Sequence, residues 1–307
     1  MDFITQLVSD PVGFYNSHTL LIANIGINSI LAASMFVVLY SGQISLAAPG
    51  FMAIGAYTSV LMELYWHTPL ALNVTAGTVL ACLVGLLVGL PVLRLRGVFL
   101  AIATIGFIEA LRLGVILNLP ITGMGLGLKN PGADPLGGIN IVLIAVAVVV
   151  FLLWRLTKGR LGHAWSAIRQ DELAALSQGI DVARYKLLAF ILSAALAAIA
   201  GGLESHLNFF VDPGDAQYGV TRAVQVLTFA VLGGSGNIFG PVVGALFLTT
   251  LPEILRFQGF DYRDIVSGVI LIAVIIFRPQ GIVGRGGLAI IRPRWWPRAQ
   301  VRAASTG

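Results

Sequence analysis

Residues 159–186 read GRLGHAWSAIRQDELAALSQGIDVARYK, a polar stretch between two apolar segments that are each long enough to cross a bilayer. Basic side chains are frequent in this stretch and just before it: Arg155, Lys158, Arg160, Arg169, Arg184 and Lys186. Membrane-flanking loops that are rich in Lys and Arg stay in the cytoplasm. The sequence therefore predicts a cytoplasmic loop over residues 157–186, and this loop fixes the orientation of the spans around it.

The centre of this loop has the pattern of a helix. Gly162 and Gly179 are stop signals around the helix-forming run HAWSAIRQDELAALSQ. At about 100° per residue, one side of the helix carries Leu161, Trp165, Ile168 and Leu176. Glu172 lies in the middle of that side, and Arg169 is one helical step away. Two interpretations follow: docking against another protein, or a surface helix on the lipid headgroups with Trp165 as its interfacial anchor.

Composition identifies the class of protein. Hydrophobic residues make up 57% of the 307 residues, charged residues 11%, and the mean hydropathy is +0.89. Soluble domains carry about 25% charged residues. At about 20 residues per span, the length accommodates about eight to ten transmembrane helices. We expect an all-α polytopic membrane protein with one transmembrane domain over residues 1–307, broken or re-entrant helices included.

The basic residues set the topology. Nine crossings with an external start place Arg94 and Arg96, the loop 157–186 and the basic tail 286–307 in the cytoplasm. The net charge of +5 reflects this pattern and does not indicate nucleic-acid binding. The expected spans are 18–40, 41–64, 69–93, 98–117, 139–156, 187–206, two short arms within 226–255, and 264–277.

Helix interruptions and a pair of asparagines are the candidate residues of a translocation pathway. Pro49-Gly50 interrupts the expected span 41–64, and a glycine-rich break separates the two short arms. In transporters such breaks tend to lie along the pathway, and a simple kink is the alternative. Asn24 and Asn28 are one turn apart and either face a cavity or, as we favour, hydrogen-bond a neighbouring helix. The candidates are Asn24, Asn28, Pro49, Gly50, Gly233, Gly234 and Gly236.

Two local patterns concern packing and charge inside the membrane. Small residues recur every four positions at Gly77, Ala81, Gly85 and Gly89, which predicts the close approach of another helix. Glu109 and Arg112 are three residues apart and can pair. Ionisable groups at membrane depth are often functional. We favour the alternative in which this pair lies near the outer end and contacts water.

A weak internal repeat relates two parts of the chain. Residues 41–44 read SGQI and residues 235–238 read SGNI, each followed by a proline and a Gly-Ala pair. Duplicated halves with broken helices at corresponding places are typical of transporters. The sequence therefore predicts an internal repeat, although the spacings differ.

Several sequence motifs of enzymes are absent. No G-x-x-x-x-G-K-[ST] motif occurs, so the chain does not bind ATP in the P-loop manner. The sequence has neither a Cys/His metal cluster nor a nucleophile elbow. We expect no catalytic residues, no metal and no cofactor in this chain.

The cytoplasmic loop and the segment after it, up to Leu203, strongly resemble the permease subunits of branched-chain amino acid ABC importers of the LivM type. SGQISLAAPGFMAIGAY, VLGGSGNIFGPVVGALF and FRPQGIVG are similar to other segments of that family, so the resemblance covers roughly residues 25–285. Glu172-x-Ala174-Ala175-x-x-x-Gly179 is similar to the EAA loop that contacts the ATPase subunits. The resemblance implies that the coupling residues are Arg169, Asp171, Glu172, Ala174, Ala175 and Gly179.

The resemblance also implies partners and a location. We expect a second, homologous permease in a heterodimeric core, two cytoplasmic ATPase subunits and an external solute-binding protein, in the inner (cytoplasmic) membrane of a bacterium. The substrate would be a branched-chain or related amino acid, with urea or amides as the alternative. Glu172→Ala or Gly179→Pro should uncouple transport in a protein that still folds.

Two rival functions belong to other classes. A secondary transporter driven by an ion gradient needs a buried titratable site, and Glu109 is the strongest mid-chain candidate that the sequence offers. A membrane-embedded enzyme needs clustered catalytic residues, which the sequence lacks.

Overall fold

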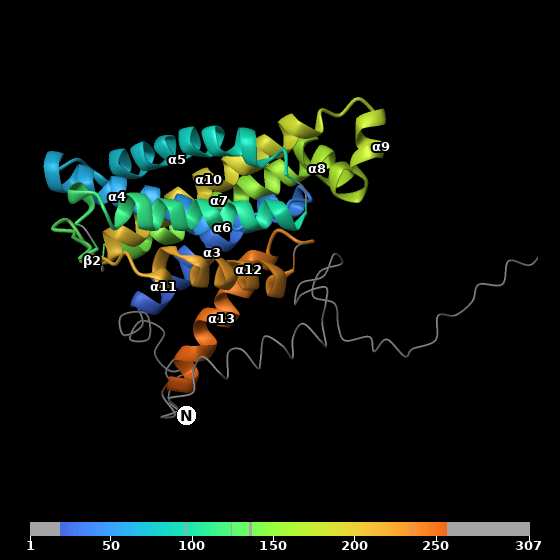
Figure 1. The fold of residues 1–307 in the computed structure, drawn as a ribbon. Helices are drawn as coiled ribbons and strands as arrows, with labels where there is room; N and C mark the ends of the chain where they lie inside the picture. Colours follow the sequence, from blue (N-terminus) through green and yellow to red (C-terminus); the bar gives the residue numbers. More distant parts are fainter. Residues whose placement is uncertain (1–18, 96, 124, 135–136, 235, 257–307) are drawn as a thin grey trace, which may run out of the picture.

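The computed structural model describes residues 19–256 except 96, 124, 135–136 and 235, with the side chains of 252–256 also left out. The expected span 264–277 and the basic tail 286–307 lie outside the described residues. Within the described part the chain is mostly helical and has only two two-residue strands, which confirms the all-α prediction. Figure 1 shows long helices side by side along a common direction. The long helices are α3 (Thr19–Tyr40), α4 (Ala48–Trp66), α5 (Leu70–Val92), α6 (Val98–Leu111, extended by a π-helical turn to Ile116), α7 (Gly138–Lys158) and α10 (Val182–Leu207).

Shorter elements complete the described chain. A π-helical turn extends α6, and two two-residue strands pair antiparallel, Leu128 with Val211 and Lys129 with Phe210. The shorter elements are η1 (Arg112–Ile116), the 3-10 turn η2 (Pro120–Thr122), β1 (Leu128–Lys129), α8 (Arg160–Gln170), α9 (Glu172–Ser177), β2 (Phe210–Val211), α11 (Asp215–Tyr218), α12 (Val220–Gly233) and α13 (Gly240–Arg256).

The helices divide into a buried centre and an exposed periphery. Among the described residues, five helical stretches are long and apolar enough to cross a membrane: α3, α5, α6 with η1, α7 and α10. Most of α3 and α10 is buried inside the protein, whereas only 22% of the apolar stretch of α5, of α6 with η1 and of α7 is buried. Exposed apolar helix faces fit lipid or another membrane subunit, because neither requires polar surface.

Small residues bring the helices close together. The predicted stripe on α5 is confirmed, because Gly77, Ala81, Gly85 and Gly89 are buried residues of that helix. A Cβ atom on Gly77 would lie 3.0 Å from the carbonyl oxygen of Gly55 on α4. The approach of α4 and α10 is closer still, since a Cβ atom on Gly201 would lie 2.0 Å from the carbonyl oxygen of Met52.

The segment before α4 differs from the prediction. We expected Pro49-Gly50 to interrupt a helix, but α4 begins at Ala48, and residues 41–47 form a non-helical connector from α3. Proline is favoured in the first turn of a helix, where its missing N–H has no intrahelical partner to lose. The connector is held inside the protein, as the amide of Leu46 donates to Oγ1 of Thr104 at 2.9 Å.

The second half of the expected repeat has a similar local order. Residues 234–239 separate α12 from α13, and Pro241 is the second residue of α13, as Pro49 is of α4. Ile238 borders a small recess with Val150 and Leu153, in the half of α7 that leads to α8. The internal repeat itself stays a prediction.

The two ends of the helix bundle carry different loops. Helices α8 and α9 lie at one end, and β2 and α11 lie at the other (Figure 1). The β end is fastened to α10, because Nδ2 of Asn130 donates to the carbonyl oxygen of Ser205 at 2.6 Å. The predicted cytoplasmic position of the basic loop would place the β end on the external side.

Candidate functional site

Helix α8 packs inward against the start of α10. Trp165 is only 2% exposed, and its Nε1 donates to the carbonyl oxygen of Tyr185 at 2.9 Å. Ile168 is also buried, in a small core with Ala175 and Val182. The alternative of Trp165 as a headgroup anchor is therefore wrong: this apolar side of α8 is already covered by the protein.

The expected single helix over residues 163–178 is wrong, because the chain breaks at Asp171. Asp171 has extended backbone angles, and α8 ends before it while α9 begins after it. Its Oδ1 accepts from the amides of Leu173 at 2.8 Å and Ala174 at 3.1 Å. Aspartate is a poor residue for a helix interior and a strong N-cap, because its side chain competes for nearby backbone amides.

The other end of α9 is closed by Gly179. This residue has φ +79°, and its amide donates to the carbonyl oxygen of Leu176 at 2.9 Å. The amide of Ile180 donates to the carbonyl oxygen of Ala175 at 3.1 Å. Six residues are too few for a stable isolated helix. Helix α9 therefore depends on its two caps and on the small core below it.

One face of α9 is exposed. Leu173 is 74% exposed and Leu176 is 50% exposed, with Ala174 exposed beside them. We call Leu173, Ala174 and Leu176 the α9 surface. The expectation that Leu176 shares a side with Trp165 is wrong, because the break at Asp171 resets the helical phase. Leu173 did not stand out in the sequence, and only the break reveals that it faces outward.

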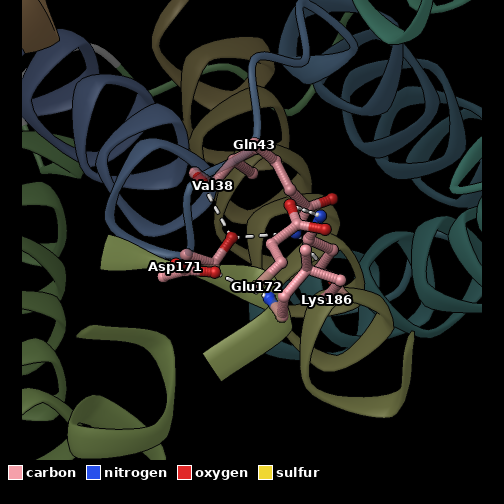
Figure 2. Close-up of polar contacts among 7 residues, drawn as sticks. Val38, Gln43, Asp171, Glu172 and Lys186 are labelled. Carbon is pink, nitrogen blue, oxygen red and sulfur yellow. Dashed lines mark hydrogen bonds and ion pairs between the residues drawn. The ribbon is translucent and has the colours of Figure 1, made fainter. Parts of the chain in front are cut away.

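Glu172 is paired within the chain. Its Oε1 forms an ion pair with Nζ of Lys186, which we had placed in the loop but which belongs to α10. Gln43, from the connector 41–47, donates from Nε2 to the carbonyl oxygen of Lys186 at 3.0 Å. Figure 2 shows the side chains of Gln43, Glu172 and Lys186 close together, with Asp171 beside them.

All six coupling candidates lie on this tip of the molecule. Glu172 is half-buried and Ala175 is buried under the α9 surface. The exposed candidates are Arg169, Asp171, Ala174 and Gly179. The structure thus brings a capped helix and its flanking residues together at one end of the bundle.

The pathway candidates have different surroundings. Asn28 is buried and bonds two other helices, with Oδ1 accepting from Nη2 of Arg222 at 2.8 Å and Nδ2 donating to Oγ1 of Thr249 at 2.9 Å. The favoured interhelical bonding is thereby found for Asn28, whereas Asn24 is exposed. The other candidates lie at helix ends: Pro49, Gly50, Gly233 and Gly234 are buried, and Gly236 is half-buried.

A buried polar cluster near the β end of the bundle was missed by the sequence reasoning. Glu204 is 5% exposed; its Oε1 accepts from Nε2 of Gln217 at 2.5 Å, and its Oε2 accepts from the hydroxyl of Tyr218 at 3.5 Å. Burial raises the pKa of Tyr218 well above its usual value, so the hydroxyl keeps its proton. Glu204 interrupts an apolar run, which was the available signal. Glu109 is therefore not the strongest mid-chain ionisable candidate.

The pairing expected of Glu109 is confirmed. Its Oε2 lies 2.8 Å from Nη2 of Arg112, at the start of the π-helical turn. Among the described residues, no group of three or more His, Cys, Asp or Glu side chains is arranged to hold a metal ion.

Replacing Asp171 with Ala should weaken α9. The substitution removes the acceptor for two amides and is expected to cost about 1 kcal/mol, whereas Asp171→Asn should cost much less, because Asn is also a good N-cap. Amide hydrogen exchange of residues 172–178 in detergent is the measurement. Equal exchange in the Ala and Asn variants would contradict the cap.

Comparisons with known proteins agree with this architecture. The family described as "Branched-chain amino acid transport system / permease component" matches residues 19–275. The chain is 32% identical over 295 residues to the high-affinity branched-chain amino acid transport system permease protein LivM of Escherichia coli K12, covering 86% of this chain and 67% of that protein. It is 33% identical over 144 residues to LivH of Salmonella typhimurium, covering 47% of this chain and 44% of LivH.

A solved structure shares the fold. A chain of PsaBC from Streptococcus pneumoniae, solved in complex with a Fab, aligns with a TM-score of 0.51 at 15% identity, covering 91% of this chain and 96% of that one. The helical architecture and the family match over most of the sequence lead to one assignment. The chain belongs to the family of permease components of branched-chain amino acid transport systems.

Proposed function

We propose that this chain is the permease subunit of an ATP-binding cassette importer for branched-chain amino acids, in the cytoplasmic membrane of a bacterium. The observation that carries the proposal is the capped helix α9, which presents Leu173 and Leu176 to the cytoplasm. Exposed apolar side chains on a rigid helix suit insertion into a groove of a partner protein. The names of the relatives LivM and LivH support the substrate class.

The mechanism is alternating access driven from the cytoplasmic side. Two ATPase subunits bind and hydrolyse ATP, and the permease binds them through the α9 surface. ATP can shift the permease between outward-open and inward-open states only if the docked surface differs between those states. Because α8 and α9 pack on α10 through Ile168, Ala175 and Val182, a displacement of the tip acts directly on a central helix.

The proposed complex has further components. A second, homologous permease completes the membrane core, and the match to LivH as well as LivM supports a heteromeric pair. The exposed apolar faces of α5, α6 and α7 are surfaces where that subunit and membrane lipid can pack. A solute-binding protein delivers the amino acid to the external end.

The first experiment is a pull-down of the tagged chain from native membranes in mild detergent, followed by transport in proteoliposomes. We expect an ATPase and a second permease to co-purify in stoichiometric amounts. Uptake of leucine, isoleucine or valine should require the ATPases and ATP on the inside of the vesicles. It should also require the binding protein on the outside. Urea or an amide as the preferred substrate would replace the amino acid, and uptake by the chain alone along an ion gradient would contradict the proposal.

A further inference from the structure

We propose that Lys186 and Gln43 are positioning residues that transmit movement of α9 to the α3–α4 connector, residues 41–47. This inference rests on the proposed function, because it concerns how ATPase binding at the α9 surface changes the arrangement of the membrane helices. It assigns Glu172 an internal role, as the partner of Lys186, in place of direct contact with the ATPase.

The first link joins α9 to α10. Glu172 is the first residue of α9, and its carboxylate pairs with Nζ of Lys186 near the start of α10. The Lys186 side chain is only 13% exposed, so water competes weakly for its ammonium group. Helix α9 therefore cannot shift away from α10 without separating two charges that are partly shielded from solvent.

The second link joins α10 to the connector. Nε2 of Gln43 donates to the carbonyl oxygen of Lys186 at 3.0 Å and to Oγ of Ser41 at 2.8 Å. Ser41 in turn donates to the carbonyl oxygen of Val38, near the end of α3, at 2.8 Å. Gln43 is itself buried. The side-chain amide of Gln43 thus connects Lys186, which pairs with α9, to the C-terminal end of α3.

A third contact joins α8 to the same connector. Gly42 has φ +82°, and a Cβ atom at this position would lie 3.1 Å from Cα of Arg169. The connector therefore contacts α8 directly, before the break at Asp171, and is linked to α9, after the break, through Lys186. Because the connector joins α3 to α4, displacement of the tip reaches two helices of the buried core.

Gln43 also has an unused acceptor. Its Oε1 is buried without a hydrogen-bond partner in the described structure. Buried polar atoms are nearly always paired, so an unpaired one favours a second arrangement in which it is satisfied. A connector with two arrangements is what a transmission element needs, because it can be biased from the cytoplasmic side.

Charge reversal separates this role from docking. In the complete importer, reconstituted with its ATPases and binding protein, we would compare Glu172→Lys, Lys186→Glu and the double variant. We expect all three to retain the ATPases. Each single reversal should lower the number of substrates moved per ATP by about tenfold, in the range typical of coupling between sites, and the double variant should recover most of the loss.

Two further variants keep the test specific. Gln43→Leu preserves size, removes the donor to Lys186, and should lower the same ratio without loss of ATPase binding. Arg184→Glu reverses a charge in a neighbouring ion pair whose Arg184 side chain is 84% exposed, and it should leave the ratio unchanged.

The outcomes are distinguishable. Loss of ATPases from the Glu172→Lys variant alone would assign Glu172 to docking and overturn the inference, as would a double variant no better than either single one. A fall in the ratio that merely follows the thermal stability of each variant would also overturn it. Absence of ATPases from the wild-type preparation would instead refute the proposed function.

Discussion

Replacing Gly201 with Ala is expected to remove most of the folded protein from the membrane, although it adds a single methyl group. The new Cβ atom would lie 2.0 Å from the carbonyl oxygen of Met52 and 3.1 Å from the amide nitrogen of Ala56. These are backbone atoms of α4, so no side-chain rotation relieves the clash, and α10 must move away. Overpacking of this kind costs about 3 kcal/mol or more, a large share of a typical folding free energy.

The matched control is Gly106→Ala. Gly106 lies on α6, and a Cβ atom there would meet nothing within 4 Å. The same chemical change should therefore be neutral or stabilising by about 0.5–1 kcal/mol, because Ala is the better helix former. Folded yield after detergent extraction, measured by fluorescence-detected size-exclusion chromatography, and thermal unfolding compare the two variants. Similar yields would show that α4 and α10 are not held at this distance.

The close helix contacts were only partly predictable. The α5 stripe was visible because Gly77, Ala81, Gly85 and Gly89 follow a period of four on one helix face. Gly55 and Gly201 belong to no such run. Each is needed because the backbone of the other residue's helix lies too close to leave room for a Cβ atom. A pattern within one segment identifies the face that packs, but the partner's position follows from the tertiary fold.

Charged pairs show the same distinction. Glu109 and Arg112 are neighbours on one helix, so their pairing could be predicted from spacing alone. Arg222 bonds Asn28 across 194 residues of sequence, and Glu204 is satisfied by Gln217 and Tyr218 from a following element. Such long-range bonds depend on how the helices are arranged.

The helical content of the α8–α9 tip was predicted, but its internal geometry was not. The basic loop and its helical content followed from composition and propensity. Asp171 is compatible with either one long helix or a cap between two, and propensity alone does not decide. The cap removes the helical phase that related Trp165 to Leu176, so one side chain is buried and the other is exposed.

The double variant Leu173→Asp and Leu176→Asp should abolish binding of the ATPase subunits while leaving the permease folded. Both side chains are exposed on a capped helix and contribute little to the core beneath it. Buried apolar anchors at a protein interface typically contribute more than about 1 kcal/mol each, so the pair should lower affinity by about 100-fold. ATPase binding to the purified permease, titrated in detergent, is the measurement.

A matched substitution at the other end of the molecule serves as the control. Leu126 is 83% exposed in the segment before β1, so Leu126→Asp adds a negative charge at the opposite end of the bundle from the tip. It should bind the ATPases like the wild type. Because α9 packs through Ala175 and the Glu172–Lys186 pair, the double variant should keep the wild-type melting temperature even where ATPase binding is lost. Retention of the ATPases by the double variant would exclude the α9 surface as their binding site.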